Sequence, residues 1–147
     1  MHEKESFNSF NCVIDCVFFS SALYYVTPKT FGKDVNPSDV DHINIFDGNT
    51  GVGFTIEDAE DIRYIVENIQ SKPMRKGGVS LGQMGYRFSV VYVDENDRAI
   101  VPIFFINGEN AIRKDPFFYY CDGGLCVDYL KKLESQSNNA AEQADDI

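Results

Sequence analysis

The chain has 147 residues and a hydrophobic fraction of 44%, which is enough apolar material for one globular domain with its own core. Its 23 acidic residues outnumber its 13 basic residues, so the formal net charge at pH 7 is −10. This charge argues against binding to nucleic acid, because affinity for the phosphate backbone requires clustered Lys and Arg. An acidic surface favours solubility and a basic protein partner instead.

Residues 1–26 predict an apolar N-terminal helix, for which two interpretations stay open. Residues 7–26 are mostly apolar and reach the roughly 20 residues that a membrane-spanning helix needs. Asp15 lies in the middle of this run, where a carboxylate costs roughly 2.5–3.5 kcal/mol on insertion scales. The run is therefore either a degenerate membrane anchor or signal, or a helix docked on the domain with Asp15 facing water. Localisation depends on this choice: extracytoplasmic and membrane-anchored, or soluble in the cytoplasm.

A change in composition marks the start of the main domain. Residues 27–39 are rich in Pro, Gly and Lys and predict a linker ahead of a domain at residues 40–134. The alternating segments Val40–Phe46 and Val52–Ile56 predict a β-hairpin. The polar segment Asp47–Gly51 between them supplies glycines for the turn.

A helix is predicted after this hairpin. Thr55 and Asp58 form a capping-box pattern, and acidic residues crowd the first turn, where the helix dipole favours negative charge. These carboxylates are better explained by helix capping than by catalysis. Apolar residues then recur at i, i+3, i+4 and i+7, as expected of a buried stripe, at Ile62, Ile65, Val66 and Ile69. Pro73 ends the helix.

Three further strands are predicted in antiparallel order at Tyr86–Val93, Ile100–Ile106 and Ile112–Tyr120, from period-two alternation and β-branched or aromatic content. A short amphipathic helix follows, with Val127, Leu130 and Leu133 on its apolar side. Residues 135–147 are polar and acidic and predict a disordered tail. The order β-β-α-β-β-β-α predicts a small α+β domain with an antiparallel sheet and helices packed on one face.

The four cysteines form two pairs, Cys12 with Cys16 and Cys121 with Cys126. A four-thiolate zinc site is disfavoured, because these spacings are not those of a zinc finger or ribbon. Cys121 and Cys126 flank a glycine turn, and we predict a disulfide there that closes a small loop, worth about 2 kcal/mol in the chain-entropy model. Two reduced and buried thiols are the alternative.

No catalytic or cofactor motif stands out in the sequence. His42 has no Ser or Cys partner nearby that would make it a general base. Gly51 and Gly53 follow a hairpin turn and lack the third glycine of a dinucleotide fingerprint. We therefore expect a protein that is not an enzyme and that binds no metal and no cofactor.

The segment Lys72–Gly82 is the predicted contact surface for a protein partner. It reads as a loop that joins helix to sheet and presents Met74, Arg75 and Lys76, and binding residues concentrate on such loops. The neighbouring turns Asp94–Arg98 and Asn107–Asn110 complete the predicted surface. The alternative is that the basic residues only solubilise the connection and complement the helix C-terminus.

Five segments carry a recognisable pattern: Phe46–Gly51, Asp58–Val66, Met84–Phe88, Asn110–Arg113 and Phe117–Tyr119. The pattern resembles a family of small uncharacterised proteins of Gram-positive bacteria over roughly residues 42–133. Members of that family usually carry an N-terminal membrane anchor, so the resemblance implies an extracytoplasmic domain. It implies no activity.

Two classes of function remain. The first is a non-catalytic protein-binding module, such as an inhibitor or an immunity-type protein whose acidic patches steer it onto a basic target. The alternative is a membrane-associated accessory or sensor domain of the cell envelope. The sequence does not name the partner and does not predict an oligomeric state.

Overall fold

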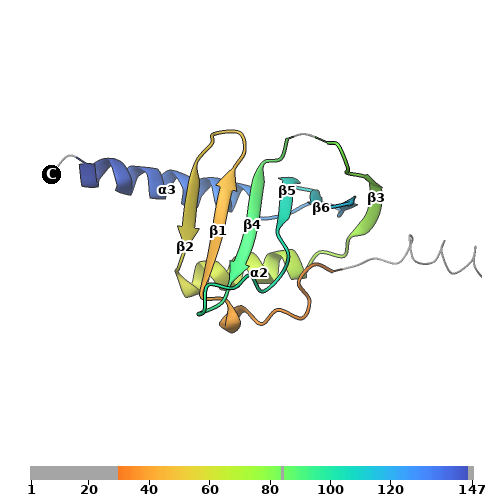
Figure 1. Ribbon diagram of the computed structural model, residues 1–147, viewed down its shortest axis with the longest axis horizontal. Coiled ribbons are helices and arrows are strands. Elements are labelled where there is room, and N and C mark those ends of the chain that lie inside the picture. The colour runs from red at the N-terminus through yellow and green to blue at the C-terminus, as the bar shows by residue number, and fades with distance from the viewer. Residues whose placement is uncertain (1–29, 84, 146–147) are drawn as a thin grey trace, which may run out of the picture.

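The computed structural model describes residues 30–83 and 85–145 of the chain (Figure 1). Short strands dominate the middle of the sequence, with one helix between β2 and β3 and another at the C-terminal end. In chain order the elements are η1 (Pro37–Asp39), β1 (His42–Asp47), β2 (Gly53–Ile56), α2 (Ala59–Gln70), β3 (Arg75–Val79), β4 (Phe88–Val93), β5 (Phe104–Gly108), β6 (Ala111–Lys114), β7 (Phe117–Tyr120) and α3 (Val127–Asp145).

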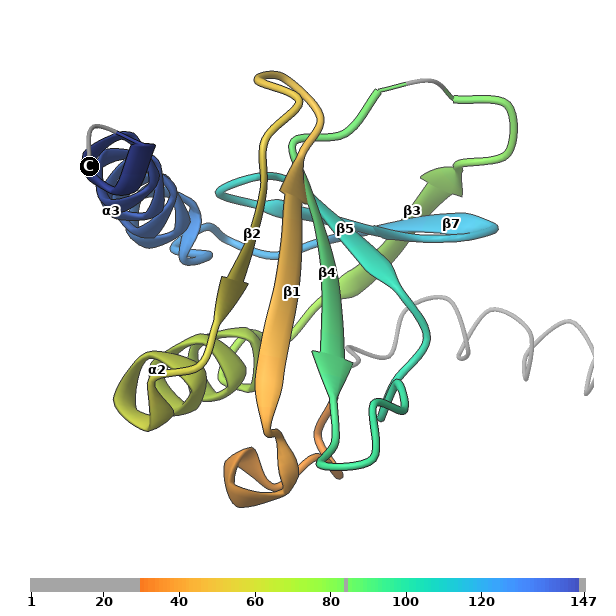
Figure 2. The same cartoon turned by 60° about the vertical axis from the view of Figure 1, so that its left-hand side comes forward.

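The seven strands of the described residues form one antiparallel sheet in the order β2-β1-β4-β5-β6-β7-β3. The hairpin β1–β2 joins the sheet through β4, and β3 pairs with β7 at the opposite edge. The sheet twists so strongly that β7 crosses the direction of β1 and β4 (Figure 2). The fold is therefore α+β with an antiparallel sheet, as the sequence predicts.

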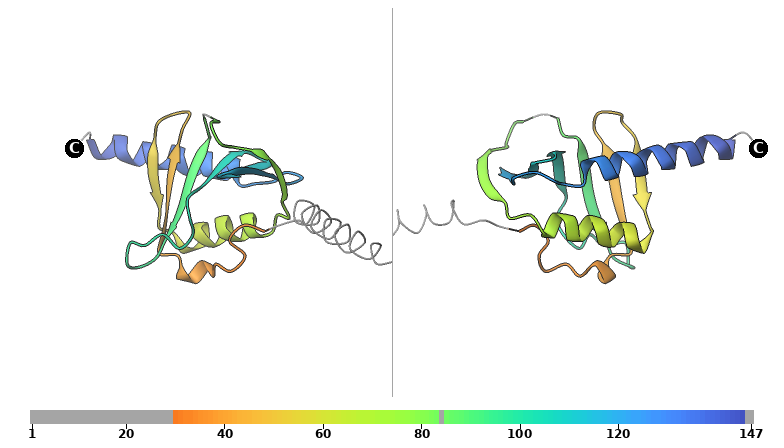
Figure 3. Two further views of the ribbon diagram at one scale, coloured as in Figure 1. Left: turned by 45° about the vertical axis from the view of Figure 1, so that its right-hand side comes forward. Right: turned by 180° about the vertical axis from the view of Figure 1, so that it is seen from behind.

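Helix α2 buries the apolar stripe that its sequence period predicts. Asp58 is its N-cap, and the Asp58 carboxylate accepts hydrogen bonds from the backbone N–H groups of Glu60 and Asp61. The four stripe residues are each at most 2% exposed: Ile62, Ile65, Val66 and Ile69. They join buried side chains of the strands and of α3 in one core, and both helices lie in front of the strands when the molecule is seen from behind (Figure 3).

Helix α3 is attached to α2 by aromatic and polar contacts near its start. The Tyr129 hydroxyl donates a hydrogen bond to Asp61 Oδ1 at 2.6 Å, and this bond raises the pKa of Tyr129 to about 12. The Tyr64 and Tyr129 rings lie 4.4 Å apart between centroids. Leu130 is fully buried, so the first turns of α3 belong to the core.

The expectation of a disordered tail over residues 135–147 is wrong for most of its length. Helix α3 continues without a break to Asp145. Ala, Glu and Gln are good helix formers, and a helix that is already nucleated gains one hydrogen bond for each residue it adds. The first turns of α3, which pack against the core, supply that nucleus. The composition of residues 135–147 does not show that a packed helix precedes them.

Two of the predicted central strands have different bounds. Ile112–Tyr120 is a hairpin, β6 and β7, because Pro116 has no N–H to donate and the chain turns between Lys114 and Phe117. Ile100–Ile106 is extended in the sheet only from Phe104, since Pro102 likewise interrupts the ladder. The segment Tyr86–Val93 is confirmed as β4 from Phe88 onward, antiparallel to both neighbours.

The capping-box expectation is also wrong in its first residue. Thr55 lies inside β2, where its hydroxyl donates to the Asn44 side chain of β1 at 2.9 Å. The helix begins three residues later, so Asp58 takes the N-cap position that the sequence assigned to Thr55. Thr and Asp are both suitable N-cap residues, because the side-chain oxygen of each accepts a hydrogen bond from a free backbone N–H group.

The predicted linker at residues 27–39 is part of the domain where the structure describes it. The Val35 side chain is buried in the core, and Phe31 packs against the core from outside. Gln70 of α2 holds this segment by donating to the carbonyl oxygens of Gly32 and Val35. Within residues 30–83 and 85–145, no helix is long and apolar enough to cross a bilayer. The predicted apolar helix at residues 1–26 lies outside the described residues.

Gly48 sits where no side chain fits, so its substitution should destabilise the turn between β1 and β2. A Cβ at this position would lie 2.6 Å from the backbone oxygen of Tyr86, and backbone cannot move aside as a flexible side chain can. We expect Gly48→Ala to lower the free energy of unfolding by about 1–3 kcal/mol, as overpacking does. Urea denaturation would measure this, with Gly78→Ala as the control because a Cβ there meets open space. Equal stability of Gly48→Ala and the wild type would contradict the close approach.

Candidate functional site

The segment Lys72–Gly82 does not form the exposed loop that the sequence predicts. Its centre is the edge strand β3, and Met74 is fully buried in the core. Lys76 lies with its ammonium 3.4 Å from the centroid of the Phe117 ring. Only Arg75 of the three predicted contact residues is exposed. Met74 is the last residue of the short connection from α2, directly ahead of β3, and there its side chain is buried in the core.

The two turns expected beside this segment lie apart from each other. The Asp94–Arg98 turn follows the end of β4, whereas the segment Asn107–Asn110 covers the last two residues of β5 and the turn into β6. Since β4 and β5 are antiparallel, with Phe88 opposite Ile106, these turns lie at opposite ends of the sheet. The structure therefore does not assemble the predicted three-part surface.

The predicted disulfide between Cys121 and Cys126 is absent, and both residues are free thiols. Cys126 is buried, and its burial raises the pKa of the thiol to about 11. Such a thiol is protonated at neutral pH and is a poor nucleophile. Cys121 lies against the carbonyl oxygens of Glu109 and Gly123. The spacing of the two cysteines across a glycine turn suggested a disulfide. In the structure the two side chains have different surroundings: Cys126 is buried in the core, and Cys121 contacts backbone carbonyl oxygens.

A groove lined by clustered carboxylates lies among the described residues. Its volume is about 510 Å³, and the ten residues that line it include no Lys and no Arg. Five carboxylates surround it: Asp39, Asp41, Glu57, Asp94 and Glu95. We call this feature the acidic groove.

Three separate segments build the acidic groove. The 3-10 turn η1 supplies Asp39, and its start is held by the Asn36 side chain, which accepts from the Ser38 N–H. The start of α2 supplies Glu57, which directly precedes the N-cap residue Asp58. The turn after β4 supplies Asp94, Glu95 and Asn96 on the remaining side. The floor is apolar, since Val40 and Ile62 are buried beneath the rim.

The turn after β4 is closed by hydrogen bonds to the carboxylate of Asp94. Asp94 Oδ1 accepts hydrogen bonds from the backbone N–H groups of Arg98 and Asn96, each at 2.9 Å. These bonds hold the pKa of the Asp94 carboxyl below its ordinary value, with the Arg98 bond contributing most. Asp41, on the other side, contacts the His42 ring at 2.9 Å. Asp94 therefore keeps its negative charge at neutral pH, and the residues that line the groove include no Lys and no Arg.

A second group of charged side chains is buried at the turn between β1 and β2. The Asp47 side chain is 0% exposed and lies 3.3 Å from Arg87 Nη2, without the geometry of a hydrogen bond. Asp47 Oδ1 accepts from the Asn49 N–H, which shapes the turn. The Thr50 hydroxyl donates at 2.6 Å to Glu134, a buried carboxylate of α3. This cluster connects the turn, the sheet and α3.

Comparisons with protein-family models, with curated proteins and with solved structures find no match. The resemblance to small proteins of Gram-positive bacteria therefore stays a prediction. The site has to be judged from its own residues.

Sequence reasoning missed most of the acidic groove. Of its residues it singled out Asp94, Glu95 and Asn96 as part of a contact surface, and it explained Glu57 as helix capping. Asp39 and Asp41 were assigned to a linker and to a strand. One signal could have found them, because acids flank the hairpin on both sides, before β1 and after β2. Within the described residues, no group of His, Cys, Asp and Glu side chains is arranged to hold a metal ion.

Proposed function

We propose that this protein is a non-catalytic protein-binding module whose acidic groove receives a basic segment of a protein partner. The observation that carries the proposal is the groove itself, with five carboxylates around an apolar floor. In this view α2 and α3 pack on one face of the sheet and stiffen it, so that the groove keeps its shape without a ligand.

The form of the groove suits the side chains of Lys and Arg. Both have an aliphatic stem that packs on apolar surface and a cationic head that remains at the polar rim. Val40, Ala59 and Ile62 offer the apolar contact, and the carboxylates above them offer the charge. A groove of about 510 Å³ has room for several such side chains of one segment.

The whole charge of the chain supports the same function. A net charge of −10 attracts a basic partner over distance, and complementary charge raises the association rate more than it raises affinity. An inhibitor or an immunity-type protein works in this way when it covers a basic site on its target. The cell-envelope alternative depends on residues 7–26, which lie outside the described residues, and it stays a prediction.

Neutralising the groove should weaken binding to a basic partner by about tenfold. The test is the triple variant Asp39→Asn, Glu57→Gln and Glu95→Gln, whose native side chains make no hydrogen bond or ion pair within the described residues. Three exposed charge pairs at about 0.5 kcal/mol each amount to about 1.5 kcal/mol, and about 1.4 kcal/mol corresponds to one factor of ten in affinity. Titration calorimetry with a Lys- and Arg-rich peptide, and with any natural partner it identifies, would measure the loss.

The control variant removes three acids that lie away from the groove: Glu67, Glu109 and Asp122, each exposed. It changes the net charge by the same amount as the groove variant. Because the groove keeps all five carboxylates, the control should keep most of the affinity for the peptide. Added salt should weaken the wild type more than the groove variant, because screening acts on exposed charge pairs. An equal loss of affinity in both variants would show that net charge alone attracts the peptide, and the groove would lose its role.

A further inference from the structure

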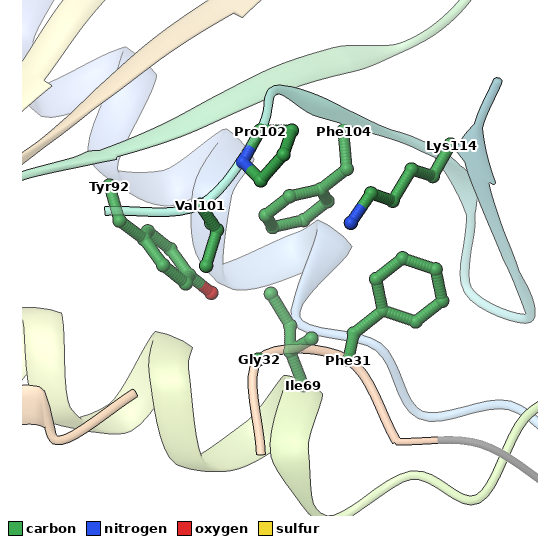
Figure 4. Close-up of a pocket in the computed structure, with 8 residues that line it drawn as sticks. All are labelled: Phe31, Gly32, Ile69, Tyr92, Val101, Pro102, Phe104 and Lys114. Carbon is green, nitrogen blue, oxygen red and sulfur yellow. The ribbon is translucent and has the colours of Figure 1, made fainter. Parts of the chain in front are cut away.

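A second, small cavity is lined by the Tyr92 hydroxyl, which has no hydrogen-bond partner among the described residues, and by the Lys114 side chain. Its volume is about 30 Å³, and it lies between the Phe31–Gly32 turn, the end of α2 and the segment ahead of β5 (Figure 4). Its walls are mainly apolar, from Phe31, Ile69, Val101, Pro102 and Phe104. It shares no lining residue with the acidic groove.

Tyr92 points its hydroxyl toward this cavity (Figure 4). The side chain is 2% exposed, and the hydroxyl has no hydrogen-bond partner among the described residues. Burial raises the pKa of Tyr92 far above its ordinary value, with a smaller contribution from nearby Cys126, so the hydroxyl keeps its proton. A buried donor without an acceptor is unfavourable, and an acceptor in the cavity would remove that penalty.

Lys114 extends from β6 into the same cavity from the opposite side (Figure 4). Its ammonium faces the Phe31 ring at 6.0 Å from the centroid. No carboxylate lies within 4.0 Å of it in the part of the chain that the structure describes. A hydroxyl donor and a cation therefore converge on one space with apolar walls.

We propose that this cavity binds the carboxylate group of a small aliphatic acid. A carboxylate oxygen accepts from the Tyr92 hydroxyl while the Lys114 ammonium neutralises its charge, and hydrogen bonds to charged groups are the stronger kind. A space of about 30 Å³ admits the head group only. The hydrocarbon tail lies along Phe31, which is half-buried, and Pro102, which is exposed. An ammonium ligand is excluded by repulsion from Lys114.

Titration of the full chain with butyrate tests this site, with butyramide and butylammonium as probes of equal length. We expect saturable binding of butyrate in NMR spectra, weaker binding of butyramide and none of butylammonium. Tyr92→Phe and Lys114→Met should each weaken butyrate binding by about tenfold or more, since each removes one charge-assisted contact. Tyr92→Phe removes only an unpartnered hydroxyl, so the variant should remain folded.

Matched controls separate this site from unspecific binding. Tyr120→Phe and Lys132→Met make the same chemical changes at exposed positions and should leave butyrate affinity unchanged. If butyrate shows no saturable binding, or if the two cavity variants bind it as the wild type does, the cavity holds water only and the proposal is overturned. Binding of butyramide as tight as that of butyrate would likewise overturn the role of charge.

Discussion

Replacing Ile65 with alanine is expected to lower the free energy of unfolding by about 2–5 kcal/mol. Ile65 is 0% exposed at the centre of the α2 stripe, within the core that joins both helices to the sheet. The substitution removes three buried carbons and leaves a cavity that close-packed neighbours fill only in part. Urea denaturation followed by circular dichroism would measure the change.

Two companion variants establish that packing causes this loss. Ile65→Val removes one carbon and should cost about 0.5–1.5 kcal/mol. Glu67→Ala changes an exposed residue of the same helix and should stay within about 0.5 kcal/mol of the wild type. If Ile65→Ala were as stable as Glu67→Ala, α2 would not contribute its stripe to the core.

Replacing Arg87 with methionine is expected to cost about 3 kcal/mol of unfolding free energy. Methionine keeps the apolar part of the side chain but leaves the Asp47 carboxylate, which is 0% exposed, without its counter-charge. Breaking a buried ion pair on one side costs about 3–5 kcal/mol. The lower end applies because the Arg87 side chain is 28% exposed, and solvent already screens part of the attraction.

A double-mutant cycle would show that the pair, and not either residue alone, is responsible. Asp47→Asn keeps the Oδ1 acceptor for the Asn49 N–H but removes the charge. The variant that combines Asp47→Asn with Arg87→Met should therefore be more stable than the sum of the single losses allows. Arg63→Met, at an exposed position on α2, is the control and should change stability by less than about 0.5 kcal/mol. Strict additivity of the single losses would contradict the proposed pairing.

The buried cluster also explains why the turn between β1 and β2 is easily misinterpreted. Asp47 and its neighbours have the composition of an ordinary exposed hairpin turn, and the turn is indeed present. Its aspartate, however, faces inward, because Arg87 and the C-terminal helix approach from segments distant in the chain. A polar residue in a turn pattern does not reveal such partners, since they are not its neighbours in sequence.

The sequence predicts the acidic character of the groove but not its position. Capping at the start of α2 is real, but only Asp58 performs it, and Glu57 is left to line the groove. The expectation of an acidic protein with a basic partner came from net charge alone. The place where the charge gathers depends on how η1, α2 and the turn after β4 meet.

The sequence by itself determined the α+β class, the hairpin of β1 and β2, and the buried stripe of α2. Each of these follows from a period of 2 or 3.6 residues, or from a turn residue, within one short segment. Only the tertiary structure decided that residues 75–79 pair with β7, that Met74 is buried and that three acidic segments form one groove. These features join segments distant in the chain, and their energies come from hydrogen bonds and burial that a local pattern does not contain.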